Sequence, residues 1–275
     1  MRPLAEFAFE ARARVRTVLT DIDDTLTTDG VITAQAYWAL ERLQRAGIRV
    51  IPVTGRPAGW CDHIARMWPV DAVVGENGAF YFRYDRGKRR MLRRFVNGDA
   101  ERATNRVRMA AVRDRILAEV PGCAVSADQE YRQADLAIDF CEDVDALPQL
   151  SVDRIVRLME QAGMTAKASS IHVNGWFGGY DKLSTTAWLF SQEFGERLDH
   201  VKPNVVFVGD SPNDVPMFEF FPNAVGVENV RRFTDALTAY PSYVTPSPCG
   251  AGFAELAEAL LSATGISGTD NTRPG

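Results

Sequence analysis

The sequence contains little histidine, cysteine or lysine, and these shortages exclude several kinds of site. Three histidines are present, His63, His172 and His200, too few to predict a histidine-based metal centre or catalytic triad. The four cysteines are scattered with no Cys-x-x-Cys pair, so we expect neither a zinc site nor a disulfide framework. Scattered thiols of this kind are typical of a reducing compartment, and the cytoplasm is the location we expect.

The chain also lacks a long apolar run and an excess of positive charge. Its first residues alternate arginine with apolar side chains, so we expect neither a signal peptide nor a membrane span. The net charge of −5 argues against nucleic acid or an anionic membrane as a partner. The 275 residues are 46% hydrophobic and 24% charged, which is typical of a globular protein with one large or two modest domains.

Three carboxylates lie within four residues at the end of an apolar run. Residues 17–22 are typical of a buried strand, and the acids are Asp21, Asp23 and Asp24. Acids this close repel one another and destabilise the fold unless a cation or a phosphate chemistry uses them. The alternative is a polar loop in which Asp24 or Thr25 caps a turn.

Strands and helices alternate in the first and last parts of the chain. Strands are expected at 17–22, 48–53 and 71–74, with helices between them at 33–46 and 57–67. The alternation resumes after residue 182, with a helix at 183–194, a buried strand at 204–210 and shorter elements up to residue 263. This pattern predicts an α/β fold with a Rossmann-like core, in which helices cover a parallel sheet.

The middle of the chain has a different pattern. A hairpin over 79–96 is followed by helix 100–119, two strands, helix 151–162 and two further strands. We therefore predict an inserted α+β cap domain over 86–181, and a core domain formed by 1–85 and 182–264. Residues 265–275 are rich in Gly, Ser, Thr, Asn and Pro, and we expect a disordered tail there.

Polar side chains follow three of the predicted parallel strands. Ligands bind at the carboxyl edge of an open α/β sheet, so these side chains are expected to converge. Converging acids indicate a hard cation with oxygen ligands, above all Mg²⁺. The residues are Asp21 and Asp23, Thr54 and Gly55, and Asp210 and Asp214. The last two acids can also cap the following helix, and both roles can hold together.

A phosphoryl group would complete such a site, because its negative charge needs cations and fixed donors. Lys182, where the inserted segment returns to the core, is a candidate for the second cation. An isolated lysine is more often a solvated surface residue. The Thr54 hydroxyl and the Gly55 N–H are candidate donors to phosphoryl oxygens.

Four short motifs follow one another along the chain: Asp21-Ile22-Asp23-Asp24-Thr25, Thr54-Gly55-Arg56, Lys182 before a helix, and Gly209-Asp210-Ser211-Pro212-Asn213-Asp214. In this order they resemble the motifs of the haloacid dehalogenase-like phosphohydrolases. The resemblance covers residues 17–260, and an α+β insertion between the second and third motifs resembles subclass IIB, which includes sugar-phosphate phosphatases.

The resemblance implies a role for each motif residue. Asp21 would be the nucleophile that forms an aspartyl-phosphate. Asp23 would protonate the leaving alkoxide and then activate the hydrolytic water. Many relatives have glycine in place of Asp24, so this carboxylate departs from the pattern. The implied phosphoryl ligands are Thr54, Gly55, Lys182 and Asn213, and the implied Mg²⁺ ligands are Asp21, the carbonyl of Asp23, Asp210 and Asp214.

The leaving group has candidate partners outside these motifs. Trp176 and Tyr180, in the segment before Lys182, are placed to stack on a sugar face, unless they pack the hinge between the domains. Candidates for polar contacts are Arg56, Glu76, Asn77, His172 and Asn174. The basic group Arg86, Lys88, Arg89, Arg90, Arg93 and Arg94 is interpreted as a solvated hairpin instead of an anion or nucleic-acid site.

We therefore expect a Mg²⁺-dependent phosphatase that acts on a small phosphorylated metabolite, most of all a sugar phosphate. One alternative is a phosphosugar mutase that resembles phosphomannomutase. Another is a non-catalytic regulatory protein that binds a phosphorylated ligand, although the presence of all the motif residues argues against it. The expected assembly is a monomer or a homodimer.

Overall fold

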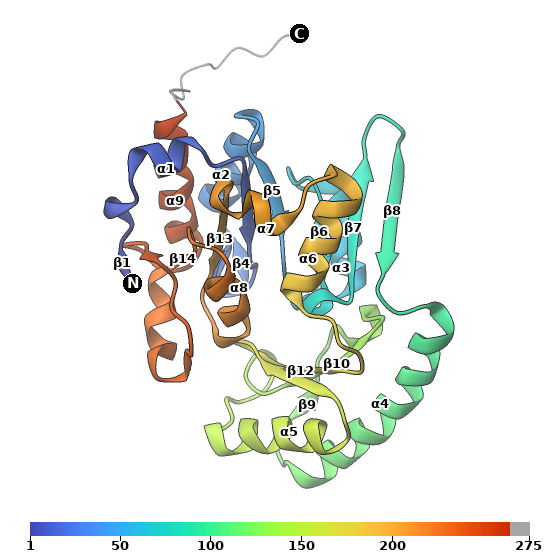
Figure 1. The fold of residues 1–275 in the computed structure, drawn as a ribbon. Helices are drawn as coiled ribbons and strands as arrows, with labels where there is room; N and C mark the ends of the chain where they lie inside the picture. The colour runs from blue at the N-terminus through green and yellow to red at the C-terminus, as the bar shows by residue number, and fades with distance from the viewer. Residues whose placement is uncertain (265–275) are drawn as a thin grey trace.

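The computed structural model describes residues 1–264, which form an α/β core and a smaller inserted unit that lies beneath the core in Figure 1. The expected fold class is confirmed. The tail that was expected to be disordered, 265–275, lies outside the described residues. Among the described residues, no helix combines the length and the apolar character needed to cross a membrane.

The core is organised around a parallel sheet whose two central strands lead into the acidic motifs. β2 (Thr17–Thr20) and β13 (Val205–Gly209) are hydrogen-bonded neighbours and are buried along their whole length. Strands covered by helices on both faces are rich in apolar residues, and here Val18 and Leu19 of β2 and Val205 to Val208 of β13 supply them. In the described chain the sheet has six strands in the order β1-β15-β14-β13-β2-β5, with β1 at Arg2–Pro3, β15 at Tyr243–Val244, β14 at Val225–Gly226 and β5 at Arg49–Pro52.

Helices cover both faces of this sheet, because successive strand side chains point to opposite sides. Val18 packs in one apolar cluster with Leu40 and Phe253, whereas Leu19 packs in another with Leu189 and Phe218. The first face is covered by α1 (Phe9–Ala13), α2 (Ala34–Arg45), α3 (Ala58–Met67) and α9 (Cys249–Ala263), and the second by α6 (Lys182–Leu189), α7 (Leu198–Val201) and α8 (Val215–Phe220).

An antiparallel sheet lies beside the core and contains the expected hairpin. β6 (Val73–Gly75), β7 (Phe80–Asp85) and β8 (Arg90–Phe95) pair in that order. An isolated parallel bridge joins Val53 to Val74, so β6 makes most of its hydrogen bonds to the hairpin. Because β8 stays paired with β7, we propose that the inserted unit starts after Phe95 and not at residue 86.

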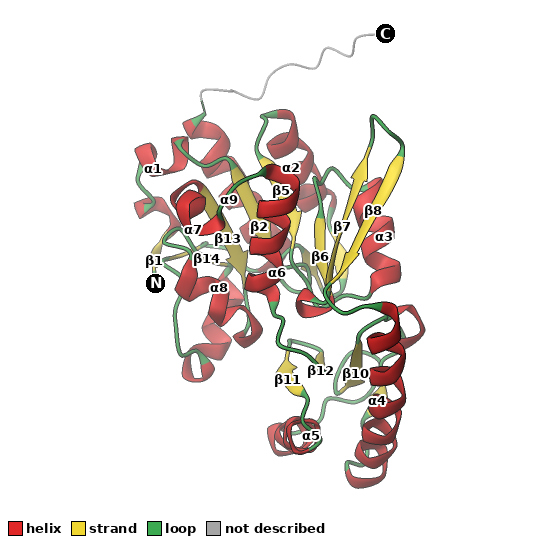
Figure 2. Cartoon of the chain, turned by 45° about the vertical axis from the view of Figure 1, so that its right-hand side comes forward, coloured by secondary structure: helices red, strands yellow, loops and turns green. Residues whose placement is uncertain are grey.

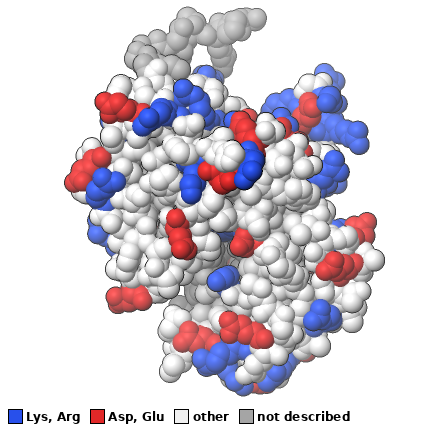
Figure 3. All heavy atoms as spheres, in the orientation of Figure 1, with Lys and Arg blue, Asp and Glu red and all other residues white. Residues whose placement is uncertain are grey.

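The basic side chains of this hairpin gather at its tip. Figure 3 shows a blue patch there, at the upper right, whereas elsewhere on this face blue and red side chains are mixed. Arg93 pairs with Asp62 of α3, and Lys88 pairs with Asp85. These pairs agree with the interpretation of the hairpin as a solvated charged surface.

The inserted unit faces the carboxyl edge of the parallel sheet. Its four strands are antiparallel in the order β11-β12-β10-β9, and two helices cover one face of them (Figure 2). The strands are β9 (Ala124–Val125), β10 (Asp135–Asp139), β11 (Thr165–Ala168) and β12 (His172–Trp176), and the helices are α4 (Asp99–Glu119) and α5 (Gln149–Gln161).

Short elements complete the described chain, and some differ from the sequence-based expectation. The helix expected near 231–238 is a 3₁₀ segment at Glu228–Ala236, and the first residues contribute the edge strand β1. The remaining elements are a small hairpin of β3 (Thr27–Thr28) and β4 (Val31–Ile32), a π-helical turn at Phe190–Phe194, and 3₁₀ turns at Leu4–Glu6, Glu76–Gly78, Gln129–Tyr131, Lys202–Asn204 and Pro212–Asp214.

Candidate active site

Three buried carboxylates meet where β2 and β13 end. Because these strands are adjacent and parallel, Asp21 and Asp210 lie next to each other, and the turn after β13 adds Asp214. One oxygen from each of the three carboxylates lies within 4.8 Å of the others. The Asp23 carboxylate is outside this group, and only its backbone carbonyl was expected to bind a metal.

The turn after β13 is shaped by Gly209 and Asp214. The Asp214 Oδ2 atom accepts hydrogen bonds from the backbone N–H groups of Asp210, at 3.1 Å, and Ser211, at 3.4 Å. A Cβ on Gly209 would lie 2.3 Å from this oxygen, so a larger residue would displace the carboxylate. Asp214 therefore caps the turn with one oxygen and presents the other to the cluster.

Lys182 is buried among these acids. It is 4% exposed, and its Nζ lies 3.1 Å from Asp21 Oδ1 and 2.7 Å from Asp214 Oδ1. Lys182 is the first residue of α6. Asp181, just before it, caps this helix, because its side chain accepts a hydrogen bond from the Ser184 N–H. The alternative of a solvated surface lysine does not hold in this structure.

The cluster brings three carboxyl groups and one ammonium group together. Burial raises the pKa of Asp21 to about 7 and that of Asp210 well above its usual range. Burial would lower the pKa of Lys182, but the two carboxylates outweigh it and the pKa is raised. If all three acids were ionised, the one ammonium group would leave unbalanced negative charge at converging oxygens. This donor set fits a hard divalent cation such as Mg²⁺.

A small enclosed cavity lies over Asp21, between the core and the inserted unit. Its volume is about 10 Å³, which leaves room for about one water-sized body. The core lines it with Asp21, Asp23, Gly55, Arg56 and Asn213, and the inserted unit with Arg132, Ser169, Ile171, His172 and Asn174.

The loop after β5 holds two of the expected phosphoryl ligands, Thr54 and Gly55, of which Gly55 lines this cavity. Thr54 is fully buried, and its hydroxyl accepts a hydrogen bond of 3.0 Å from the Arg56 N–H, so its own proton remains available to donate. Gly55 lines the cavity, and the Asn77 side chain packs against it. Asn213 reaches the same cavity from the turn after β13.

Arg56 joins the Asp23 carboxylate to the inserted unit. Its Nε lies 2.9 Å and 3.1 Å from the two Asp23 oxygens, and its terminal nitrogens lie 2.8 Å from Glu142 and 3.6 Å from Asp128. The His172 Nε2 lies 2.8 Å from the other Glu142 oxygen. Together His172 and Arg56 lower the pKa of Glu142 to about 2. Arg56 is thus an ion-pair centre between the two units.

Arg132, which the sequence reasoning missed, makes a second contact between the units. It is buried and pairs with Asp128 and Asp135, and it donates a 2.9 Å hydrogen bond to the Gly55 carbonyl. Asn174 donates to Asp135 at 2.9 Å and belongs to the same network. A buried arginine is visible in a sequence only through its acidic neighbours, which are common on surfaces as well.

Glu76 is a third link between the units. Its carboxylate is fully buried and accepts hydrogen bonds from the backbone N–H groups of Ala58, Gln133 and Ala134, at 2.6–2.9 Å. Ala58 begins α3, while the other two residues belong to the inserted unit. This carboxylate was expected near the leaving group, but it holds the inserted unit against the core.

Replacing Glu76 with alanine is expected to lower the free energy of unfolding by about 3 kcal/mol or more. The substitution leaves two buried N–H groups and one partly buried N–H group without an acceptor, and each buried unsatisfied group costs about 1–3 kcal/mol. Urea unfolding followed by circular dichroism measures the change. Glu130→Ala, at an exposed glutamate of the inserted unit, is the matched control. Equal stability of the two variants would contradict the clamp.

Trp176 and Tyr180 pack together at the hinge. Trp176 is 1% exposed, its ring stacks on that of Tyr180 at 5.9 Å, and its Nε1–H donates to the Tyr180 carbonyl at 3.2 Å. Both rings also line a hinge pocket of about 260 Å³ together with Asn77, Lys182 and Lys167. The two aromatic rings therefore pack the hinge between the units, and a contact of either ring with substrate stays a prediction.

Asp24 occupies a strained position in the motif loop. Its φ angle is +54°, a left-handed conformation that glycine adopts freely and that aspartate tolerates better than most residues. Its carbonyl accepts from the Asn229 side chain at 3.0 Å, and burial raises the pKa of its carboxyl group. The backbone conformation at this position is therefore one that glycine would adopt without strain.

The chain is similar to known proteins over most of its length. Residues 18–105 match the model of a family described as haloacid dehalogenase-like hydrolase. A phosphoglycolate phosphatase from Pyrobaculum aerophilum is 28% identical over 255 residues, which are 90% of this chain and 96% of that protein.

Solved structures share the fold of core and inserted unit. A crystal structure from Thermoplasma acidophilum has a TM-score of 0.67 at 19% identity, covering 90% of this chain and 98% of the other. A sugar phosphatase of haloacid dehalogenase subclass IIB has a TM-score of 0.58 at 15% identity, covering 92% of this chain and 100% of the other. At these identities the likeness shows the fold alone.

Proposed function

We propose that this chain, which belongs to the haloacid dehalogenase-like hydrolases and is a phosphatase, hydrolyses the monoester of a small metabolite through an aspartyl-phosphate intermediate. The strongest support is the buried cluster in which Lys182 lies between Asp21 and Asp214. A carboxylate that attacks a phosphoryl group needs cations beside it, and this cluster holds one cation and the ligands for another.

In this proposal Asp21 attacks the phosphorus, and the bond from phosphorus to the leaving oxygen breaks. Asp23 gives its proton to that oxygen, then takes a proton from the water that attacks the aspartyl-phosphate. Phosphate leaves and Asp21 is restored. Lys182, Thr54, Gly55 and Asn213 hold the phosphoryl oxygens. Asp21, Asp210, Asp214 and the Asp23 carbonyl would hold Mg²⁺, which would further neutralise the charge of the phosphoryl oxygens when bound.

Two substrate classes are candidates for this reaction. Phosphoglycolate is the first, because relatives that match nearly the whole chain carry that name. A sugar phosphate, expected from the sequence, is the second, and the subclass IIB structure carries the name of a sugar phosphatase.

Phosphate release from a panel of phosphoglycolate and sugar phosphates tests this function. We expect turnover with Mg²⁺, its loss in EDTA and its return when Mg²⁺ is added in excess, because the acids need a cation to accept a phosphoryl dianion. Isomerised sugar phosphate without free phosphate would instead support a mutase. Binding without turnover of any ester would contradict the phosphatase and support the regulatory protein.

A further inference from the structure

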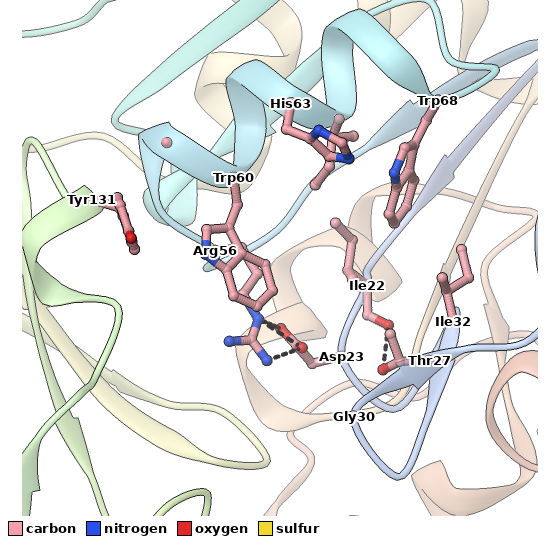
Figure 4. A pocket seen from close by; sticks show the side chains of 12 residues that line it. Ile22, Asp23, Thr27, Gly30, Ile32, Arg56, Trp60, His63, Trp68 and Tyr131 are labelled. Carbon is pink, nitrogen blue, oxygen red and sulfur yellow. Dashed lines mark hydrogen bonds and ion pairs between the residues drawn. The ribbon is translucent and has the colours of Figure 1, made fainter.

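A second and much larger pocket lies on the other side of the Asp23–Arg56 ion pair. It has a volume of about 720 Å³, within the range of small-molecule sites. Figure 4 shows the pair at its base, with Trp60, His63 and Trp68 along one side and Ile32 and Thr27 along the other. Asp23 and Arg56 line both this pocket and the enclosed cavity, so the pair forms the wall between them.

We propose that this pocket receives the leaving group of phosphate monoesters whose leaving group is a flat aromatic ring. The inference rests on the proposed phosphatase function and extends it to a second substrate class, the aryl phosphates. Hydrolysis breaks the bond between phosphorus and the aryl oxygen, Asp23 protonates the released phenolate, and water completes the turnover as above.

The position of Asp23 determines the direction in which a leaving group extends. The leaving oxygen must lie beside Asp23 to receive its proton, and the enclosed cavity is too small for a ring. The hinge pocket of about 260 Å³ is lined by Lys182 and Asn213 but not by Asp23. Of the hinge pocket and the large pocket, the large pocket is the one that Asp23 lines.

The lining of the pocket favours an aromatic ring over a sugar. Trp60 is 43% exposed, and together with Trp68, Ile22 and Ile32 it offers apolar surface to a flat ligand. Thr27, which could bond a hydroxyl, already donates to the Ile22 carbonyl and accepts from the Asp24 N–H. His63 and Tyr131 are further polar side chains in the lining, but the surface beside them is mainly apolar and suits a flat ring better than a polyhydroxylated sugar.

Arg56 has other partners when its ion pair with Asp23, which separates the two pockets, is broken. Its guanidinium also contacts Glu142 at 2.8 Å and lies 4.5 Å from the centre of the Trp60 ring. When the guanidinium releases Asp23, Glu142 and the Trp60 ring remain as its partners. The same movement frees the Asp23 carboxyl group to exchange a proton with the leaving oxygen.

Kinetics with two esters test this inference. We expect Trp60→Ala to lower kcat/KM for 1-naphthyl phosphate at least about tenfold more than for phosphoglycolate, because a lost hydrophobic contact costs about 10–200-fold in specificity. Trp38→Ala removes another half-exposed tryptophan, on α2, that also lies beside an arginine, and should leave both values unchanged. Equal losses for both esters, or none, would overturn the proposal.

Binding of 1-naphthol separates this inference from the proposed function. The alcohol carries no phosphate, so its affinity reports the pocket alone. We expect calorimetry to show binding to the wild-type chain and at least about tenfold weaker binding to Trp60→Ala. If no ester releases phosphate but this difference is seen, the function is wrong and the pocket stands. No binding, or equal binding to both proteins, would overturn the pocket.

Discussion

Replacing Asp21 with asparagine is expected to lower kcat by at least about 10⁴-fold for every ester that the wild-type chain hydrolyses. The amide nitrogen and oxygen cannot form the aspartyl-phosphate, so the reaction loses its first step. Phosphate release in saturating Mg²⁺ measures the loss. The effect should be on kcat far more than on KM, because Lys182 and Thr54 remain to bind the phosphoryl group.

The fold is expected to survive this substitution. Burial raises the pKa of Asp21 to about 7, so the folded chain disfavours its charged form, and a neutral side chain of the same shape adds no such penalty. Asp29→Asn, at an exposed position of the same segment, is the control for the chemical change. Thermal unfolding should show both variants folded, and wild-type turnover by Asp21→Asn would remove Asp21 as the nucleophile.

The sequence predicted the convergence at Asp21 and Asp210 because local signals were enough. Each acid follows a buried apolar strand, and strands of this kind in an α/β pattern are parallel with their carboxyl ends together. Because β2 and β13 are adjacent in the sheet, the two acids that follow them lie side by side. No knowledge of side-chain contacts was needed for this part of the site.

The contacts between the units could not be predicted in the same way. Glu142 and Arg56 are 86 positions apart and meet only because the inserted unit folds back over the core. Glu76 lies in a segment that is typical of a turn, and its burial depends on the backbone of Gln133 and Ala134. Nothing within a few residues of Arg132 distinguishes it from the many exposed arginines of this chain.

Short elements and unit boundaries also depend on contacts between residues that are far apart in the sequence. β1 has only two residues, so it has no periodicity to detect, and its partner β15 lies far away in the sequence, at Tyr243–Val244. The start of the inserted unit is predicted at residue 86 from the turn signal of the hairpin, and the later start that we propose rests on strand pairing that continues to Phe95. Turn residues show where a chain reverses, but pairing decides to which unit the returning strand belongs.

Replacing Lys182 with methionine is expected to lower the free energy of unfolding by about 3 kcal/mol or more in EDTA, and to reduce kcat/KM at least about 10³-fold. Methionine keeps the length of the side chain but leaves Asp21 and Asp214 without their shared cation, and breaking a buried pair costs about 3–5 kcal/mol. Urea unfolding and phosphate release measure the two effects. Lys167→Met, at an exposed lysine that lines the hinge pocket, is the control.

The pH dependence of this variant distinguishes a lost charge from lost packing. Without Lys182 the pKa of Asp21 should rise above its value of about 7, since the nearest cation is gone while burial remains. A carboxyl group whose pKa is higher in the folded chain than in the unfolded chain destabilises the fold as the pH rises from the unfolded to the folded pKa. The stability difference between Lys182→Met and the wild-type chain should therefore shrink as the pH is lowered toward about 7, where Asp21 becomes protonated in the wild-type chain as well. A difference that stays constant with pH would show that Lys182 contributes through packing, and would contradict its role as the cation of the cluster.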